Sequence, residues 1–207
     1  LCLAALPAMA QYGVWKKAES RKVKDPVTGM QLTLLTDTLA NDRFLYQTDP
    51  MWTPDGKYLL FRSSNRDAGE EVVDKDGKKQ LKKSTQLFFI EVATGRIIQA
   101  TKGTNTGSGF LANRSNRMFL NRRVDGKWNM YVIDLNRFFA DAKAGKVGDP
   151  SEYEQYLGTF PQEMGRPGGY CINSEDDWAY ITVERDGTQE EIDRMNAAAF
   201  LPESNQP

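Results

Sequence analysis

The chain has 207 residues, 40% of them hydrophobic, and a formal net charge of −1. This length allows one or two hydrophobic cores. The near-neutral charge argues against nucleic acid as the main partner, because phosphate binding needs a net basic face. Seventeen Gly, nine Pro and 11% aromatic residues favour a β-rich fold with many turns. After residue 10, no apolar run approaches the roughly 20 residues that a membrane span needs.

The first ten residues, LCLAALPAMA, have the features of the end of a secretory signal peptide. They are apolar and uncharged, and Ala8-Met9-Ala10 provides the small residues of a cleavage site. We therefore expect an exported protein, periplasmic or secreted, whose mature chain begins at Gln11; a short buried strand or helix is the alternative. Cleavage there leaves Cys171 as the only cysteine of the sequence, which excludes an internal disulfide.

Short hydrophobic runs between turn signals predict antiparallel strands. Residues 27–36 alternate apolar and polar side chains, the period of a half-buried strand. A Pro-Asp-Gly sequence at 54–56 predicts a tight turn, and the charged stretch 65–84 predicts a solvated hairpin around Asp76-Gly77. A four-stranded meander results, with predicted strands at 51–53, 57–63, 86–92 and 96–101.

The same pattern recurs twice further along the chain. Strands are predicted at 109–112, 117–122 and 128–136, and again at 169–172 and 178–183. Between these two groups the sequence RFFADAKAG predicts a short helix that ends at Gly145, and a second helix is predicted near the C-terminus after a capping box at Thr188.

Repeated four-stranded meanders are typical of a β-propeller. Trp52, Leu111 and Ile172 occupy equivalent positions, 59 and 61 residues apart, and each repeat carries an insertion. We predict an all-β fold: a β-propeller of four-stranded antiparallel blades, incomplete with about three blades present, and with short helical insertions. A complete small sandwich and a dimer of half-propellers are the alternatives.

The chain is predicted to divide into a signal peptide remnant (1–10), an irregular segment (11–26) and a partial propeller (27–207). The partial propeller is predicted to comprise a closing strand (27–36), a blade (44–101), a second blade (107–136), an insertion (137–164), a partial blade (168–187) and a helix (188–201).

The stretch WTPDGKYLLF, from Trp52 to Phe61, resembles the TolB-like, WD-type propeller repeat, with an aromatic residue, Thr-Pro-Asp-Gly and a hydrophobic strand. A longer resemblance, over residues 27–185, is to the N-terminal half of oligogalacturonate lyases. It is carried by the opening TG-x-Q-x-T-x-LT, by Tyr46-Gln47 ahead of the first blade, and by the glycine-rich run from Thr101 to Leu111.

Oligogalacturonate lyases are seven-bladed propellers that cleave short pectin fragments by β-elimination. The resemblance implies that manganese or another divalent metal, together with an arginine, neutralises the uronate carboxylate while a histidine removes the α-proton. This sequence contains no histidine, so none of the family's catalytic residues or metal ligands can be assigned to it.

Either the catalytic residues and metal ligands lie C-terminal to these 207 residues, or this relative of the lyases has lost them. We expect the full-length protein to be a carbon–oxygen lyase acting on acidic oligosaccharides, and this part alone to be inactive. The alternative is a non-catalytic TolB-like propeller that binds a protein or glycan in the cell envelope.

Ligands of propellers usually lie near the loops that border the innermost strands. These loops are predicted at 41–48, 104–109 and 162–170. Their arginines suit an anionic sugar, and their tyrosine rings suit a sugar face; ordinary loop residues are the alternative. The candidate substrate-binding residues are Arg43, Tyr46, Gln47, Arg166 and Tyr170.

Other conspicuous residues are interpreted as structural. The acidic run Glu175-Asp176-Asp177 is expected to be a solvated turn rather than a metal site. Crowding near the propeller axis would explain the glycines of the inner strands, and inter-blade packing would explain the large aromatic residues. These residues are Gly107, Gly109, Gly168 and Gly169, and Trp52, Phe61, Trp128 and Trp178.

Overall fold

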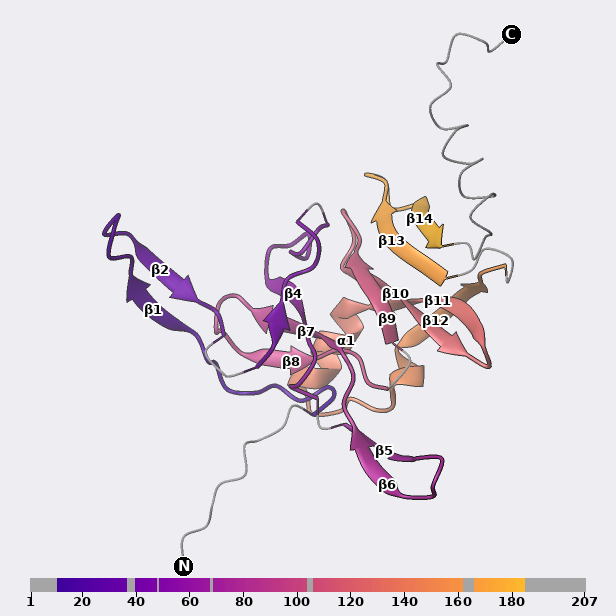
Figure 1. The fold of residues 1–207 in the computed structure, drawn as a ribbon. Helices are drawn as coiled ribbons and strands as arrows, with labels where there is room; N and C mark the ends of the chain where they lie inside the picture. Colours follow the sequence, from indigo (N-terminus) through magenta and orange to yellow (C-terminus); the bar gives the residue numbers. More distant parts are fainter. Residues whose placement is uncertain are drawn as a thin grey trace, which may run out of the picture.

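The computed structural model describes residues 11–36, 40–47, 49–67, 69–103, 106–161 and 166–184. The predicted signal peptide and the predicted helix at 188–201 lie outside these ranges. Within them the fold is mostly β, built of antiparallel sheets of up to four strands (Figure 1). Among the described helices, none is long and apolar enough to cross a bilayer.

The first four-stranded sheet has the order β3-β4-β7-β8 and is antiparallel throughout. The central strands read YLLFRS and QLFFIE, and almost all their residues are buried. Such continuous apolar runs are expected of strands that are covered on both faces. The predicted antiparallel meander is therefore confirmed. Its strands are β3 (Asp42–Arg43), β4 (Tyr58–Ser63), β7 (Gln86–Glu91) and β8 (Ile97–Gln99).

The edge strand of this sheet differs from the prediction. Residues 51–53 form only an isolated bridge, Trp52 to Leu59, and β3 takes the edge position next to β4. The physical reason is the pair of prolines that flank 51–53, since neither Pro50 nor Pro54 has an N–H for a ladder.

The Pro-Asp-Gly turn is confirmed. Gly56 has φ of 68°, a conformation that favours glycine. The Thr53 hydroxyl donates to Asp55 Oδ1 at 2.7 Å and the Lys57 N–H donates to the same oxygen at 3.1 Å. Partial burial acts to raise the pKa of Asp55, but the hydrogen bonds from Thr53, Lys57 and Asn116 outweigh it and lower that pKa to about 2.

The second four-stranded sheet has the order β12-β11-β10-β9. Its fourth strand, β12, lies inside the region predicted as an insertion, 137–164, and is a correction to that prediction. Most of its residues, EQYLGT, are not buried, so the strand lacks the hydrophobic run by which the others were recognised. The strands are β9 (Thr106–Leu111), β10 (Arg117–Val124), β11 (Lys127–Asp134) and β12 (Glu154–Thr159).

The predicted short helix is confirmed as α1 (Leu135–Lys143), and a 3-10 turn, η1 (Pro150–Glu152), follows it. Asp134 caps α1, because its side chain accepts from the N–H groups of Asn136 and Arg137. The buried face has the spacing of an amphipathic helix. It consists of Leu135, Phe138, Phe139 and Ala142.

The two four-stranded sheets and α1 share the main hydrophobic core. The core joins Leu60 and Phe89 of the first sheet to Met118 and Leu120 of the second and to Phe138 of the helix. Gly109 confirms the close approach expected of the inner strands, since a Cβ there would lie 2.4 Å from Leu87 Cδ1. A separate cluster packs the other face of the second sheet against the hairpin β13 (Arg166–Ile172) and β14 (Ala179–Glu184).

The acidic turn of that hairpin is not simply solvated. The Asp176 carboxylate accepts from the N–H groups of Asn113, Arg114 and Ser115 at 2.6–2.9 Å, and from the Ser115 hydroxyl at 3.0 Å. We call this contact the aspartate latch. It ties the β13–β14 hairpin to the β9–β10 turn across 61 to 63 residues of sequence. Glu175 and Asp177 are exposed, as predicted, and Asp176 is the exception.

The N-terminal region also departs from the prediction. The predicted closing strand, 27–36, contains β2 (Gln31–Leu34), which pairs with β1 (Arg21–Lys24) within the segment predicted to be irregular. All residues of β2 are exposed, so it is not half-buried by the described part of the chain. Residues 12–16 bridge to β8.

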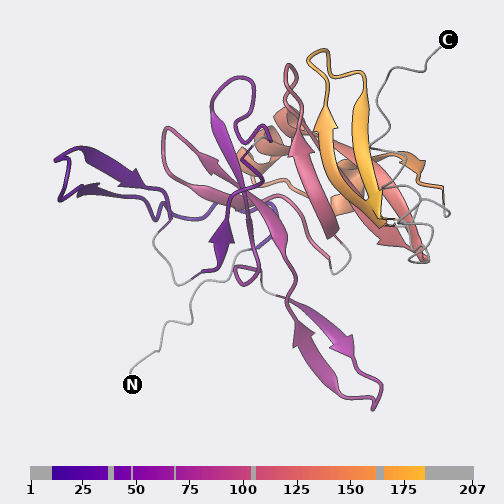
Figure 2. The same ribbon diagram turned by 45° about the horizontal axis from the view of Figure 1, so that its top comes forward.

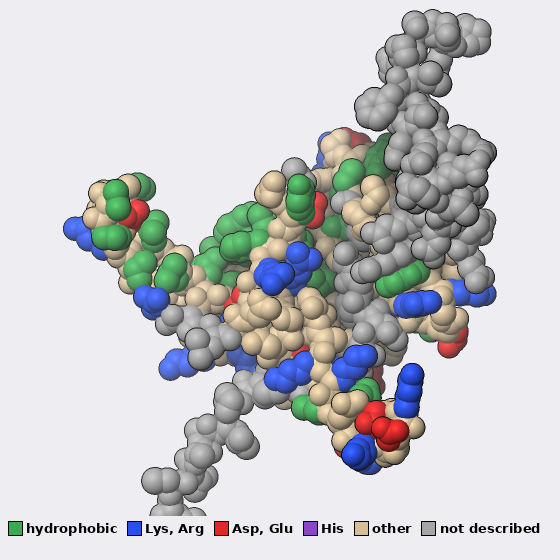
Figure 3. All heavy atoms as spheres, in the orientation of Figure 1, with side chains coloured by type: hydrophobic (Ala, Val, Ile, Leu, Met, Phe, Trp, Pro, Cys, Tyr) green, Lys and Arg blue, Asp and Glu red, His purple; other side chains and the backbone are tan. Residues whose placement is uncertain are grey.

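Two hairpins project from the body of the molecule (Figure 2). One is β1–β2, and the other is β5 (Glu70–Val73) with β6 (Lys79–Lys82), which confirms the predicted solvated hairpin at 65–84. Hydrophobic side chains are visible at the surface between β1–β2 and the first sheet (Figure 3).

The large aromatic side chains that were expected to be packed differ in their burial. Phe61 is buried, as predicted, but Trp52 is 49% and Trp178 is 65% exposed, so the expectation that they are packed is wrong for the described chain. Trp178 immediately precedes β14 at the end of the described region, and no described sheet covers it.

Candidate functional site

Two arginines lie opposite each other at one edge of the first sheet. Arg43 of β3 is the register partner of Arg62 of β4, and both line a pocket of about 270 Å³. We call it the arginine pocket. Its other lining residues are Asn41, Ser63, Ser64 and Thr85.

The positive charge in this pocket is not neutralised locally. Among the described residues, neither Arg43 nor Arg62 has a hydrogen-bond or ion-pair partner; Arg62 acts only at longer range on Asp49. Like charges directly opposite on neighbouring strands destabilise a sheet. An anion between the two guanidinium groups would relieve that repulsion and accept charge-assisted hydrogen bonds.

A polar network positions the loop beside these arginines. The Asn41 N–H donates to Asn65 Oδ1 at 2.6 Å, and Asn41 Nδ2 donates to Ser64 Oγ at 3.0 Å. The Ser63 hydroxyl donates to the same Asn65 oxygen at 3.4 Å. The pocket therefore combines two cations with hydroxyl and amide groups, which suits a hydroxylated anion.

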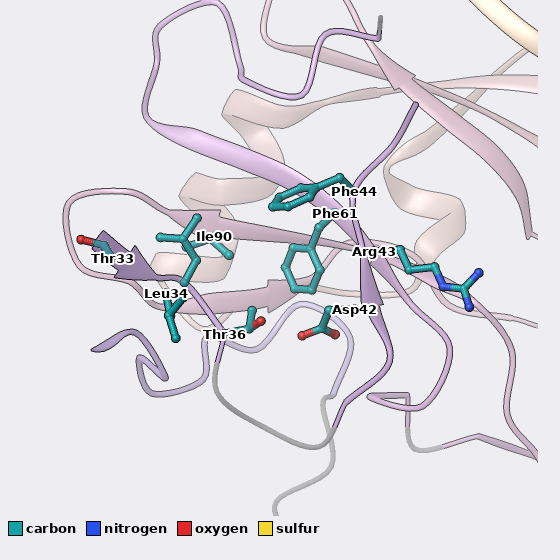
Figure 4. Close-up of a pocket in the computed structure, with 9 residues that line it drawn as sticks. Thr33, Leu34, Thr36, Asp42, Arg43, Phe44, Phe61 and Ile90 are labelled. Atoms are coloured by element: carbon teal, nitrogen blue, oxygen red, sulfur yellow. The ribbon is translucent and has the colours of Figure 1, made fainter. Parts of the chain in front are cut away.

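Arg43 points away from an apolar cavity on the other side of β3. This cavity, of about 290 Å³, lies between β2 and the first sheet. Leu34, Phe44, Phe61 and Ile90 contribute its apolar lining, whereas the Arg43 guanidinium extends out of it (Figure 4). A cavity of this composition is suited to packing against another apolar surface, not to polar chemistry.

A third arginine close by is fully paired. Arg66 donates from Nη1 and Nη2 to the two Glu19 oxygens, and from Nε and Nη2 to the two Asp42 oxygens, each at 2.7 Å. Its side chain is 8% exposed. Burial opposes ionisation of Asp42, but the hydrogen bonds from Arg66 outweigh it and lower the pKa of that carboxyl group. Arg66 is thus a structural residue.

A third cavity, of about 580 Å³, lies between the loop that holds Tyr46 and Asp49 and the β13–β14 hairpin. We call it the tyrosine cavity. Burial raises the pKa of Asp49 within it. A hydrogen bond from the Tyr46 backbone and the charge of Arg62 act in the opposite direction, but burial outweighs them. The lining residues are Tyr46, Asp49, Pro50, Asn113, Gly169, Cys171, Ile172, Tyr180, Ile181 and Thr182.

The structure separates the residues that the sequence placed in one site. Arg43 lines the arginine pocket and Tyr46 lines the tyrosine cavity. Gln47 is exposed in the loop after β3 and lines neither of them. Arg166 and Tyr170 belong to β13, and their side chains lie outside the described part of the chain.

Three residues of these cavities were missed from the sequence. Arg62 was taken only as part of a strand; its position opposite Arg43 depends on the register, and hence on β3. Asp49 and Tyr180 carry no motif, and they reach one cavity through a contact between segments more than 100 residues apart. Only the polar side chain of Arg62 within YLLFRS offered a signal.

The described residues do not fit a metal centre. No group of three or more Cys, Asp or Glu side chains within them could hold a metal ion, and the sequence contains no histidine. The carboxylates of Glu19, Asp42 and Asp176 are already engaged by Arg66 and by backbone N–H groups.

Comparison with known proteins gives a partial structural match. The fold is similar to that of an oligogalacturonate lyase solved in complex with manganese, with a TM-score of 0.55 and 22% identity over 81% of this chain and 36% of that one. It is equally similar to the oligogalacturonate lyase of Vibrio parahaemolyticus, with a TM-score of 0.55 and 21% identity over 80% of this chain and 36% of that one.

This chain shares its fold with part of an oligogalacturonate lyase. It spans about a third (36%) of the length of either lyase. No protein family description matches the sequence, and no curated protein does. The expected resemblance is therefore confirmed at the level of the fold.

Proposed function

We propose that the chain is part of an oligogalacturonate-lyase-like β-propeller, and that it contributes a binding surface for acidic oligosaccharides. The stacked antiparallel sheets support the propeller, because each face of the second sheet packs on a neighbouring sheet. The match to a third of two lyases supports the family. Export, inferred from residues 1–10, belongs to this proposal.

The arginine pocket is the observation that carries the proposal. Uronic acid oligomers present a carboxylate on every sugar ring, with hydroxyl groups around it. Arg43 and Arg62 are two unpaired guanidinium groups in register on neighbouring strands, and Asn41 and Ser64 lie beside them. Guanidinium is suited to bidentate recognition of carboxylate, so the pocket would hold one uronate group and orient its ring.

The β-elimination itself would require parts that the described residues do not supply. The reaction needs a cation at the carboxylate and a base for the α-proton. The arginine pocket provides cations, but the sequence has no histidine and the described chain has no metal-ligand cluster. Manganese or another divalent metal, with its ligands and the base, would belong to the remainder of a longer protein. This chain would act by binding and orienting the substrate.

Titration with oligogalacturonate tests the binding role. The chain should bind oligogalacturonate by calorimetry, and the Arg43→Gln and Arg62→Gln variants should each weaken binding about tenfold, since each removes a charge-assisted pair. Arg123→Gln is the matched control, because Arg123 is an exposed arginine of the second sheet. Equal affinity in all four proteins would refute the role of the pocket.

A non-catalytic propeller that binds a protein or glycan in the cell envelope remains the second candidate. It needs neither a base nor a metal ion, so the paired arginines of the pocket would suffice for it. The two functions differ in turnover. A lyase given manganese would produce an unsaturated sugar that absorbs ultraviolet light, whereas a binding protein would release oligogalacturonate intact.

A further inference from the structure

The tyrosine cavity differs from the arginine pocket in its charge and its aromatic content. Tyr46 and Tyr180 are 64% and 62% exposed at its rim. Asp49 is the one ionised side chain among its described lining residues. The volume of about 580 Å³ lies within the range of about 300–1,000 Å³ that is typical of small-molecule sites.

Two oxygen acceptors line this cavity, the Asp49 carboxylate and the Asn113 side-chain oxygen, beside the hydroxyl groups of Tyr46 and Tyr180. Asn113 Nδ2 already donates to the carbonyl oxygens of Ile172 and Asn173, and the Thr182 hydroxyl accepts from the Gly169 N–H. In the described structure, the Asp49 carboxylate accepts a hydrogen bond from the Tyr46 backbone and keeps further acceptor capacity, and no hydrogen bond engages the Asn113 side-chain oxygen. A ligand must therefore offer hydrogen-bond donors to satisfy these oxygens.

The charge of the cavity argues against an anion. An acidic sugar carboxylate placed here would meet Asp49, and the described lining residues include no cation; Arg62 acts on Asp49 only from outside the lining. An uncharged sugar ring has no such penalty: its hydroxyl groups donate to carboxylate and amide oxygens, and its apolar C–H face packs on an aromatic ring.

We propose that the tyrosine cavity binds an uncharged sugar ring, with hydroxyl groups donating to Asp49 and Asn113 and the ring lying against Tyr46 or Tyr180. It would be a site separate from the arginine pocket. The proposal does not depend on lyase activity or on acidic oligosaccharide binding, because it uses none of the residues of that pocket.

The test compares four probes on the 207-residue chain by ligand-observed NMR and calorimetry: methyl galactoside, methyl ester of galacturonic acid, galacturonate and ethylammonium. The two uncharged sugars should bind in the millimolar range, and galacturonate should bind this cavity more weakly. Tyr46→Ala should weaken uncharged sugar binding about fivefold, as expected for loss of a stacking ring. Tyr156→Ala, which removes another exposed tyrosine on β12, should leave it unchanged.

Asp49→Asn provides a readout that a merely structural role would not give. In the Arg43→Gln/Arg62→Gln background, which removes uronate binding by the arginine pocket, loss of the Asp49 charge should weaken the uncharged sugars about threefold and strengthen galacturonate, so the two affinities change in opposite directions. Arg43→Gln should leave uncharged sugar binding unchanged, which keeps this site distinguishable from the arginine pocket.

Three results would overturn the proposal. The first is the absence of uncharged sugar binding to the wild-type chain. The second is tighter binding of ethylammonium than of either sugar, which would identify a cation site. The third is loss of uncharged sugar binding in Arg43→Gln together with no effect of Tyr46→Ala, which would assign the ligand to the arginine pocket.

Discussion

Arg66 and the pair Arg43–Arg62 show two opposite uses of one residue type within a single sheet and its adjoining loop. Arg66 is buried and holds two carboxylates through four hydrogen bonds at 2.7 Å. Arg43 and Arg62 are exposed, lie side by side, and have no partner among the described residues. The charge that is satisfied stabilises the fold, and the charge that is not satisfied is available to a ligand.

The carboxylates show the same contrast. Asp176 is engaged by three backbone N–H groups and a hydroxyl, whereas Asp49 accepts only from the backbone of Tyr46 in the described structure. The direction of the pKa shift follows: it is lowered for Asp176 by hydrogen bonds that outweigh burial, and raised for Asp49 by burial.

Removal of Arg66 should have the largest effect on stability. Arg66→Met leaves Glu19 and Asp42 as partly buried carboxylates without a cation, and breaking such a pair costs about 3 kcal/mol of unfolding free energy. Urea denaturation measures the loss. Arg66→Lys should recover part of it, because an ammonium group cannot form both bidentate contacts. A loss no larger than that of Arg123→Gln would contradict the structural assignment.

Removal of the aspartate latch should have an intermediate effect on the free energy of unfolding. Asp176→Ala should cost about 1–2 kcal/mol, reduced by partial solvent exposure. The pKa of Asp176 is lowered on folding, so its contribution is present above the unfolded value near 3.8 and is lost as pH falls through the lower folded value. The stability difference between wild type and Asp176→Ala should therefore shrink in acid, as followed by denaturation at several pH values. A difference that is constant with pH would argue against the latch.

Substitution in the arginine pair should change binding far more than stability. Arg43→Gln removes a like-charge repulsion, so the free energy of unfolding should stay within about 0.5 kcal/mol of the wild-type value or rise slightly. Thermal unfolding measures this. If Arg43→Gln destabilised the chain as strongly as Arg66→Met, the distinction between binding and structural arginines would fail.

Substitution of Asp49 should have the smallest effect on the free energy of unfolding, and it should stabilise the chain rather than destabilise it. Because its pKa is raised on folding, ionisation weakens the folded state as pH rises through that value. Asp49→Asn should therefore stabilise the chain slightly at neutral pH and have no effect in acid. A destabilised Asp49→Asn at pH 7 would show that its carboxylate has a structural partner.

The sequence predicted the repeating architecture well, because it depends on local chemistry. Apolar runs such as YLLF and the Pro-Asp-Gly turn specify buried strands and a hairpin without knowledge of their neighbours. The sequence did not reveal β12, whose residues are mostly not buried, nor the pairing of β1 with β2. Both are edge elements whose strand character comes from a partner rather than from burial.

The site was predicted less well for a related reason. Arg43 and Tyr46 were found from loop position and residue type, but their division between two cavities depends on register and on contacts across the chain. Asp176 looked like an exposed acid because its partners, backbone N–H groups near Ser115, are provided by another repeat.

Oligogalacturonate binding by wild type and by the Arg43→Gln/Arg62→Gln double variant tests the central claim most directly. Wild type should bind with an affinity that falls as salt concentration rises, and the double variant should lose that affinity while its unfolding free energy is unchanged. Undiminished binding by a folded double variant would contradict the assignment of the unpaired arginines to ligand recognition.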